Sequence, residues 1–113
     1  MQEQFPQVEL HTVVGDFERP LQLPPLDGIV MANSLHFVRD KAGVLTRVRG
    51  YLKPGGRLLM VEYNSDQGNR WVPYPFSYPS WERMSEESGF THTERLATYP
   101  SRFLHEIYAA ASW

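Results

Sequence analysis

Two side chains that can move protons follow apolar segments of the chain. His36 comes soon after the apolar run Gly28–Ala32, and Glu62 lies near the end of the apolar run Leu58–Tyr63. Because imidazole titrates near neutrality, His36 can act as a general base. Glu62 can act as a base or bind an amine. Each also has a plainer interpretation, His36 as a hydrogen-bonded loop residue and Glu62 as a solvated strand end.

A metal site is not expected from this sequence. The remaining histidines, His11, His92 and His105, lie on predicted strands at no metal-ligand spacing. The chain has no cysteine, which excludes a thiolate metal site and a disulfide framework. The pair Gly55-Gly56 precedes a strand rather than a helix, so it is interpreted as structural and not as a phosphate-binding turn.

The elements that position these residues can be read from the apolar pattern. Val8–Val14 is rich in β-branched residues and predicts a strand. Gly28–Ala32 and Leu58–Tyr63 are continuous apolar runs, as in strands covered on both faces. A helix between these two runs begins after Asp40 as N-cap and stops at Pro54-Gly55-Gly56. Its apolar face is formed by Val44, Leu45, Val48, Tyr51 and Leu52.

The second half of the chain predicts a loop, a helix and a hairpin. Asn64–Pro79 is a long loop, Ser80–Ser88 is a short helix, and Gly89 ends it in the left-handed conformation. Phe90–Tyr99 and Arg102–Ala111 are two strands joined at a turn. The alanines near the end also favour helix, but the hairpin context favours strand. The order of elements predicts an α/β fold with a mostly parallel sheet and an antiparallel carboxyl-terminal hairpin.

Aromatic residues gather in and after the predicted loop. They can line an apolar acceptor pocket, form a lid over the sheet or make an interface, and we favour packing or an interface. The series is Trp71, Tyr74, Phe76, Tyr78 and Trp81.

Length and charge limit the class of protein. The chain has 113 residues and a formal net charge of −2, which suits one domain spanning residues 1–113. The near-neutral charge argues against nucleic acid or an anionic membrane as partner. No apolar run approaches the roughly 20 residues of a membrane span. The polar start Met1–Gln7 differs from a signal peptide, so we expect a cytoplasmic protein.

Four segments in order resemble class I S-adenosylmethionine-dependent methyltransferases. They are Gly15-Asp16-Phe17, Asp27-Gly28-Ile29-Val30-Met31-Ala32-Asn33, Leu35-His36-Phe37 and Leu52-Lys53-Pro54-Gly55-Gly56-Arg57-Leu58. The resemblance covers nearly the whole chain, from the third strand of that fold to its closing hairpin. It implies an incomplete Rossmann-like methyltransferase sheet, with ligands bound beyond the carboxyl ends of the strands.

The resemblance also implies site residues. Asp16 and Phe17 match positions beside the adenine of the cofactor, and Ala32 and Asn33 match the strand end that faces its methionine part. Asp16 can equally be a turn residue, and Asn33 can simply satisfy a strand end. His36 and Phe37 match positions near the methyl acceptor. The end of the next strand, also at the ligand edge, is matched by Glu62, Tyr63 and Asn64.

The glycine-rich turn and the acidic ribose-binding residue of that family precede the part that this chain resembles. No G-x-G-x-x-G pattern occurs in the sequence. Each lost hydrogen bond costs roughly 0.5–1.5 kcal/mol, so losing several weakens binding by powers of ten. S-adenosylmethionine is therefore a possible cofactor by resemblance, but we expect the isolated chain to bind none.

The missing strands predict association. Without them, Gly28–Ala32 becomes a sheet edge that is prone to pair with another chain. We expect a homodimer that shares this edge or exchanges Val8–Val14. A small-molecule ligand also stays possible.

Three hypotheses about function follow. The leading one is a methyltransferase-related protein, catalytically incomplete alone, that acts as a dimeric binding or interaction module. The second is a small-molecule methyltransferase whose site is completed by dimerisation or by a partner chain. The third is a gene remnant that folds without a selected role. The sequence does not identify a methyl acceptor.

Overall fold

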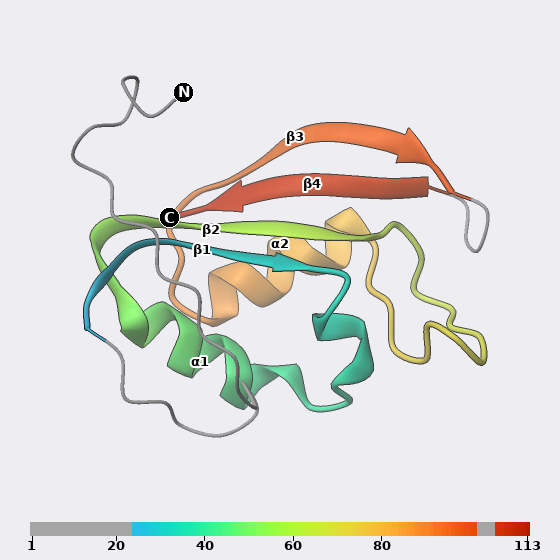
Figure 1. The fold of residues 1–113 in the computed structure, drawn as a ribbon, viewed down its shortest axis with the longest axis horizontal. Coiled ribbons are helices and arrows are strands. Elements are labelled where there is room, and N and C mark those ends of the chain that lie inside the picture. The colour runs from blue at the N-terminus through green and yellow to red at the C-terminus, as the bar shows by residue number, and fades with distance from the viewer. Residues whose placement is uncertain (1–23, 102–105) are drawn as a thin grey trace.

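A mixed four-stranded sheet with two helices on one face forms the centre of the molecule (Figure 1). The computed structural model describes residues 24–101 and 106–113. The predicted strand Val8–Val14 lies outside these residues, as do Asp16 and Phe17. In chain order the elements are β1 (Leu26–Ala32), the 3₁₀ helix η2 (Leu35–Phe37), α1 (Lys41–Tyr51), β2 (Leu52–Tyr63), α2 (Tyr78–Glu87), β3 (Thr93–Pro100) and β4 (Glu106–Ser112).

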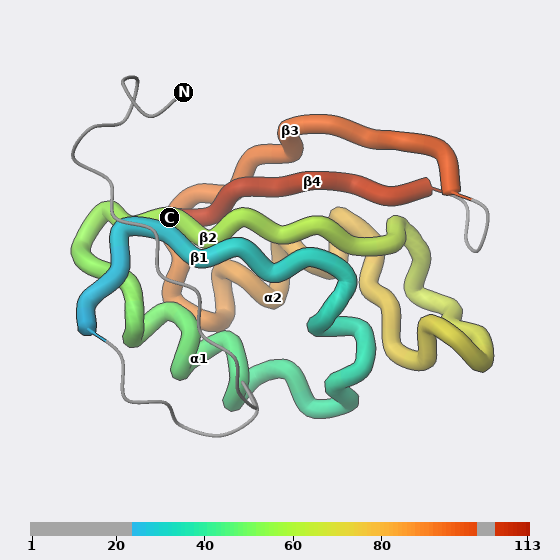
Figure 2. Tube along the Cα trace, viewed as in Figure 1, coloured from blue at the N-terminus to red at the C-terminus, as the bar shows by residue number. Residues whose placement is uncertain are grey.

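The strand order in the sheet is β1-β2-β4-β3. Strands β1 and β2 are parallel, joined by a crossover that contains α1, whereas β2–β4 and β4–β3 are antiparallel. The tube in Figure 2 shows β3 and β4 as a hairpin along one side of the sheet. The predicted α/β class and the carboxyl-terminal hairpin are confirmed, and the alanine-rich last segment is a strand.

The hydrophobic core lies between the helices and one face of the sheet. Both helices lie on this same side in Figure 1. The β-branched and leucine side chains of α1 meet alternate residues of β1, β2 and β4, which point to one face because side chains alternate along a strand. This core contains Met31, Val44, Leu45, Val48, Leu58, Met60, Trp81, Tyr108 and Ala110.

The described residues do not cover β1 and β2 on both faces, as the apolar runs had led us to expect. Val30 on β1 is 66% exposed, and Leu59 beside it on β2 is 38% exposed. These two side chains point away from the core, and no described helix packs over them. The continuous apolar pattern therefore predicted the strands but not their one-sided burial.

Strand β2 is longer than the predicted Leu58–Tyr63. It begins directly after α1, and Pro54-Gly55-Gly56 lies inside its bounds. The pairing with β1 shifts register there, between Leu26 and Gly28 of β1. At Gly56 a Cβ atom would lie 2.9 Å from the carbonyl oxygen of Lys53. The close approach of two backbone segments explains the glycine, and this turn is structural as expected.

Helix α2 begins two residues before the predicted start. Ser77 is its N-cap, and Pro79 lies in the first turn, where its missing N–H costs nothing. The predicted stop is confirmed, because Gly89 follows the helix with φ +102°. Asp40 does occupy the N-cap position of α1, but its side chain makes no capping hydrogen bond.

The carboxylate of Asp66 fixes the start of α2. It accepts hydrogen bonds from the backbone N–H of Ser77 at 2.9 Å, from the Ser77 hydroxyl at 2.8 Å and from the Ser80 hydroxyl at 2.7 Å. Burial acts to raise the pKa of Asp66, but these donors, with the charge of Arg83, outweigh it and lower the pKa. The ionised form is therefore bound more tightly in the folded chain.

The aromatic series divides between the core and the surface. Phe76 and Trp81 are buried, and the Tyr108 hydroxyl donates to the Phe76 carbonyl oxygen at 2.9 Å. Trp71 and Tyr74 are exposed on the loop. The favoured packing role thus holds for the two buried residues.

Among the described residues, no helix is long and apolar enough to span a membrane.

Replacing Asp66 with Ala should lower the free energy of unfolding at pH 7 by about 1 kcal/mol, the usual effect of losing a cap. Because its pKa is lower in the folded chain, this stabilisation is present above the unfolded pKa of about 3.9 and is lost as the pH falls through the folded value. Thermal unfolding of both proteins between pH 7 and pH 2 measures the difference. Asp40→Ala is the control, because Asp40 makes no capping bond. An equal loss in both variants would contradict the role of Asp66.

Candidate functional site

The carboxyl ends of β1 and β2 lie side by side, because the two strands are parallel neighbours. Ala32 is paired with Val61, and the N–H of Asn33 donates to the Val61 carbonyl oxygen at 2.9 Å. The chain then turns into η2, which carries His36. Glu62 follows Val61, so the strand pairing brings the two candidate catalytic residues to the same edge.

His36 and Glu62 are in direct contact. The imidazole Nδ1 lies 2.7 Å from Glu62 Oε1, and the His36 backbone N–H donates to Oε2 at 3.1 Å. The N–H of Tyr63 also donates to Oε1, at 3.3 Å. The carboxylate therefore holds both the ring and the backbone of His36, which fixes the imidazole in one orientation.

The contact selects the tautomer of His36. A carboxylate only accepts hydrogen bonds, so an ionised Glu62 requires the proton of the neutral imidazole on Nδ1. Nε2 then carries a lone pair and can accept a proton. A histidine held by a carboxylate in this way is a frequent arrangement for general-base catalysis.

The pair is deeply buried. His36 is 2% exposed and Glu62 is 0% exposed. The imidazole packs against the rings of Phe37 and Tyr63, with centroids 4.3 Å and 5.6 Å away. The His36 carbonyl oxygen accepts from the N–H of Tyr74 at 2.9 Å, which ties the loop to η2. Burial strengthens electrostatic interactions within the pair.

The charge of Glu62 acts on the pKa of two further groups, Lys41 and Tyr108. Burial lowers the pKa of Lys41, while the nearby Glu62 carboxylate acts to raise it. The Lys41 ammonium donates to the Val38 carbonyl oxygen at 2.8 Å. Burial, with the Glu62 charge added, raises the pKa of the Tyr108 hydroxyl, so Tyr108 stays protonated. Lys41 is therefore the cation that partly compensates the buried carboxylate.

The backbone at the end of β1 has an unusual conformation. Asn33 has φ +54°, a left-handed value that asparagine tolerates better than most residues. Ala32 and Asn33 are exposed, and Phe37 is 59% exposed beside the buried His36. These three residues are thus exposed where β1 ends and η2 follows.

Asn64 has a structural role at the same edge. Its amide nitrogen donates to Glu106 Oε1 at 2.7 Å, and its amide oxygen accepts from the N–H of Tyr78 at 2.8 Å. These bonds join the end of β2 to α2 and β4. Both polar groups of the Asn64 side chain are therefore used to hold these elements together. His36 and Glu62, in contrast, contact each other.

The other sequence candidates lie elsewhere. Asp16 and Phe17 are outside the described residues. The ring of His92 stacks on Trp113, with centroids 4.2 Å apart. In residues 24–101 and 106–113, no group of three or more histidine, aspartate or glutamate side chains can hold a metal ion.

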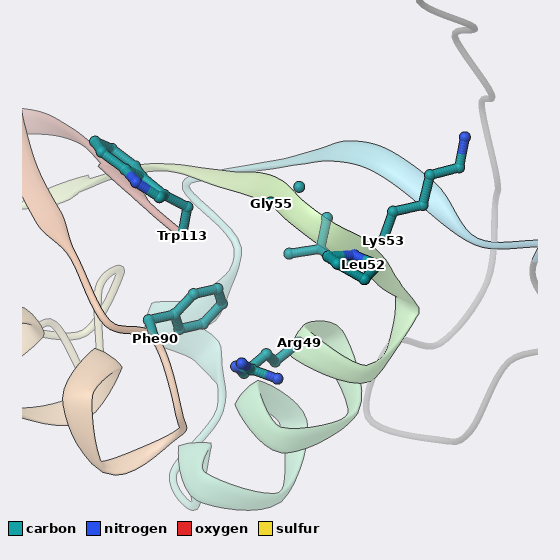
Figure 3. Close-up of a pocket in the computed structure, with 8 residues that line it drawn as sticks. Arg49, Leu52, Lys53, Gly55, Phe90 and Trp113 are labelled. Atoms are coloured by element: carbon teal, nitrogen blue, oxygen red, sulfur yellow. The ribbon is translucent and has the colours of Figure 1, made fainter.

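A separate cavity of about 220 Å³ lies at the opposite end of β2 (Figure 3). Phe90 and Trp113 form its aromatic walls and Arg49 borders it, whereas the Lys53 ammonium points away from it and lies 3.4 Å from Asp27 Oδ1. The Arg49 Nε donates to the Gly89 carbonyl oxygen at 2.8 Å, which links α1 to the end of α2. This cavity is not connected with Glu62, because Glu62 lies at the other end of the strand.

Sequence reasoning found both members of the pair but not their contact. The signal was available, since His36 follows one apolar run, Glu62 lies near the end of the next, and both runs were predicted to be strands of a mostly parallel sheet. Lys41 was missed, because a lysine at the start of a helix has no distinctive pattern. Its role depends on burial beside Glu62, which only the three-dimensional arrangement reveals.

Comparison with known proteins identifies the relatives of this arrangement. A family model described as a methyltransferase domain matches residues 1–60. A hybrid PKS-NRPS synthetase of Fusarium is 28% identical over 103 residues, covering 72% of this chain and 3% of that protein. Acetylserotonin O-methyltransferase of Mus musculus is 54% identical over 50 residues, covering 42% of this chain and 13% of that enzyme.

A solved structure shares the fold. The CurJ carbon methyltransferase superposes with a TM-score of 0.66 at 22% identity, over 98% of this chain and 37% of that chain. The chain thus spans a small part of the curated relatives and about a third of this structure.

Replacing Glu62 with Gln should destabilise the protein. An amide in place of the carboxylate keeps the shape but cannot accept at both positions with full charge, which costs about 1–3 kcal/mol of unfolding free energy for a buried group. Thermal or urea unfolding measures this loss. The exposed Glu87, also replaced by Gln, is the control and should change little. Equal stability of the Glu62 variant and the wild type would contradict the hydrogen bonding described.

Proposed function

The chain belongs to the methyltransferase domain family, and we propose that it supplies the proton-accepting part of an S-adenosylmethionine-dependent methyltransferase site. The contact of 2.7 Å between His36 Nδ1 and Glu62 Oε1 carries this proposal. It is the one place in the described chain where a base, its orienting carboxylate and a ligand-binding sheet edge coincide.

The residues have distinct roles in this proposal. Glu62 orients the imidazole and stabilises the positive charge that His36 gains on protonation. Nε2 of His36 takes the proton from the acceptor, and the electron pair of the broken bond stays on the acceptor atom. S-adenosylmethionine supplies the methyl group when it is bound. Phe37 and Tyr63 flank the imidazole and limit the access of water.

The acceptor is proposed to be an atom that must lose a proton, a carbon next to carbonyl groups or a hydroxyl oxygen. The names of the similar proteins support this class, since one is a carbon methyltransferase, another an O-methyltransferase and a third a polyketide-type synthetase. A buried base is most useful for such acceptors, because they are poor nucleophiles until deprotonated.

The cofactor site is proposed to be incomplete in this chain alone. The edge at Ala32 and Asn33 can face one part of the cofactor, but a close cradle needs glycine at a turn beside it. The described glycines nearest in sequence, Gly28 and Gly43, lie within β1 and α1 rather than at that edge. The described residues alone therefore do not fit the whole cofactor, and a polypeptide segment outside them would have to complete the site.

A second candidate function is a dimeric binding or interaction module. The observation that favours it is the exposure of β1. This strand pairs only with β2 among the described strands, and Val30 on it is 66% exposed. An unpaired, apolar edge strand is prone to associate. In this case the His36–Glu62 pair is a structural element of the fold.

Calorimetric titration of the 113-residue chain with S-adenosylmethionine tests the incompleteness. We expect no stoichiometric heat with ligand up to about 1 mM, because the missing bonds together weaken binding by several powers of ten. Stoichiometric binding with a dissociation constant in the micromolar range would overturn this part of the proposal.

Hydrogen–deuterium exchange of a 1,3-diketone tests the base without any cofactor. The wild-type chain should accelerate exchange of the acidic C–H with D₂O, and His36→Gln should lose most of this effect, since a positioned base contributes about 10²–10⁴-fold. Glu62→Gln should reduce it, and His92→Gln is the control. If wild type and His36→Gln exchange the probe at the same rate, the base assignment is wrong.

A further inference from the structure

We propose that Lys41 is a positioning residue of the His36–Glu62 pair, which fixes the loop between β2 and α2 on η2 and keeps His36 in the tautomer that can accept a proton. This inference rests on the proposed function, because it explains how the base is held ready. Lys41 is assigned no contact with the cofactor or with the methyl acceptor. It acts through the two residues of the pair and through the loop beside them.

The ammonium group of Lys41 joins three segments of the chain. Lys41 is the first residue of α1, and its Nζ donates to the carbonyl oxygen of Val38, the C-cap of η2, at 2.8 Å. The same Nζ lies 5.7 Å from the ring centroid of Tyr74 and 5.4 Å from that of Phe76. Both distances are within the range of cation–π attraction. One cation therefore links α1, η2 and the end of the loop.

The loop is in turn attached to the backbone of His36 (Figure 1). The N–H of Tyr74 donates to the His36 carbonyl oxygen at 2.9 Å, whereas the His36 N–H donates to Glu62 Oε2 at 3.1 Å. Phe76 is buried in the core, but Tyr74 is exposed and has less packing to hold it. The attraction between Lys41 and the Tyr74 ring thus acts on the segment that binds His36.

The positive charge of Lys41 also acts on Glu62. Lys41 is half-buried. Burial lowers the pKa of Lys41, and the Glu62 carboxylate opposes this effect. A Coulomb interaction is reciprocal, so the ammonium stabilises the ionised carboxylate in return. The partly dry surroundings strengthen this interaction relative to water.

Titratable groups from several segments surround Glu62. His36 of η2 contacts it directly, and Lys41 of α1 acts on it through charge. Tyr108 of β4 is its partner across the sheet, and the Glu62 charge adds to the burial that raises the pKa of Tyr108. Asp66 of the loop acts on Tyr108 in the same direction. Tyr108 is neutral and Asp66 is acidic, so Lys41 supplies the positive charge in this set.

The ionisation of Glu62 decides the tautomer of His36. An ionised carboxylate only accepts hydrogen bonds, so Nδ1 carries the proton of the neutral imidazole and Nε2 can accept another. A protonated carboxyl group can instead donate to Nδ1, and the neutral imidazole is then protonated on Nε2. Loss of the charge of Lys41 therefore moves His36 toward the tautomer in which Nε2 is no base.

Two matched variants of Lys41 test this role. Lys41→Met removes the charge but keeps a long apolar side chain, and Lys41→Arg keeps the charge. In Lys41→Met, long-range ¹H–¹⁵N spectra should show the Nε2-protonated tautomer of His36. The His36-dependent exchange of a 1,3-diketone should fall roughly 2- to 5-fold, the effect of one charge in a partly exposed place. Lys41→Arg should restore both, and Lys53→Met, which removes an exposed lysine, is the control.

Amide hydrogen exchange measures the hold on the loop separately. The N–H of Tyr74 should exchange about 3- to 30-fold faster in Lys41→Met than in the wild type, the range that cation–π attraction spans. Lys41→Arg should stay close to the wild type, because guanidinium groups also bind aromatic faces. The amides of β4 are the internal control for general destabilisation. Circular dichroism and thermal unfolding confirm that each variant is folded.

Titration of Lys41 by NMR needs no substitution of the lysine. The signal of its ε-carbon should follow a pKa below the usual lysine value, because burial outweighs the effect of Glu62. Glu62→Gln should lower this pKa further, since it removes the charge that raises it. Glu94→Gln, on the exposed part of β3, is the control. An equal pKa of Lys41 in wild type and Glu62→Gln would overturn the coupling of the two charges.

The outcomes separate this inference from the proposed function. If Lys41→Met keeps the wild-type tautomer and exchange rate, the role of Lys41 is wrong and the base assignment stands. If the wild type itself is protonated on Nε2, the proposed function fails and this inference fails with it. Losses in Lys41→Met that Lys41→Arg restores support the inference. Equal losses in both variants contradict it, because the shape of the side chain rather than its charge would then be responsible.

Discussion

The parallel pairing of β1 with β2 is the constraint on which the rest of the structure depends. It requires a crossover, which α1 provides, and it brings the carboxyl ends of both strands to one edge. His36 and Glu62 meet there because His36 follows the end of β1 and Glu62 is the second-last residue of β2. The same pairing fixes which side chains face the helices, and therefore which apolar residues stay uncovered. A change of register by one residue would separate the pair and reverse the two faces.

Much of the fold could be predicted from local patterns, and the failures have physical causes. The apolar runs and the punctuation at Gly89 identified elements because these signals depend on nearby residues. The exposure of Val30 could not be predicted, because a continuous apolar run is the same whether one or both faces are covered. The inclusion of Gly56 in β2 depends on a close backbone contact with Lys53, which leaves no periodic pattern.

In the candidate site, too, single residues could be predicted from the sequence, whereas the contacts between distant segments could not. His36 and Glu62 were recognised as single residues from their chemistry and their places after strands. Their contact and burial, and the proximity of Lys41, arise only when distant segments pack. Glu62 points to the core side of β2, whereas Leu59 and Val61 point to the other side.

The tautomer of His36 tests the central claim most directly. Long-range ¹H–¹⁵N correlation spectra of the uniformly labelled chain at neutral pH distinguish the two ring nitrogens of each histidine, with His36→Gln to assign the signal. The account predicts that the neutral imidazole is the tautomer protonated on Nδ1, with Nε2 able to accept a proton. The tautomer protonated on Nε2 would contradict it, because Nε2 would then be a hydrogen-bond donor rather than a base.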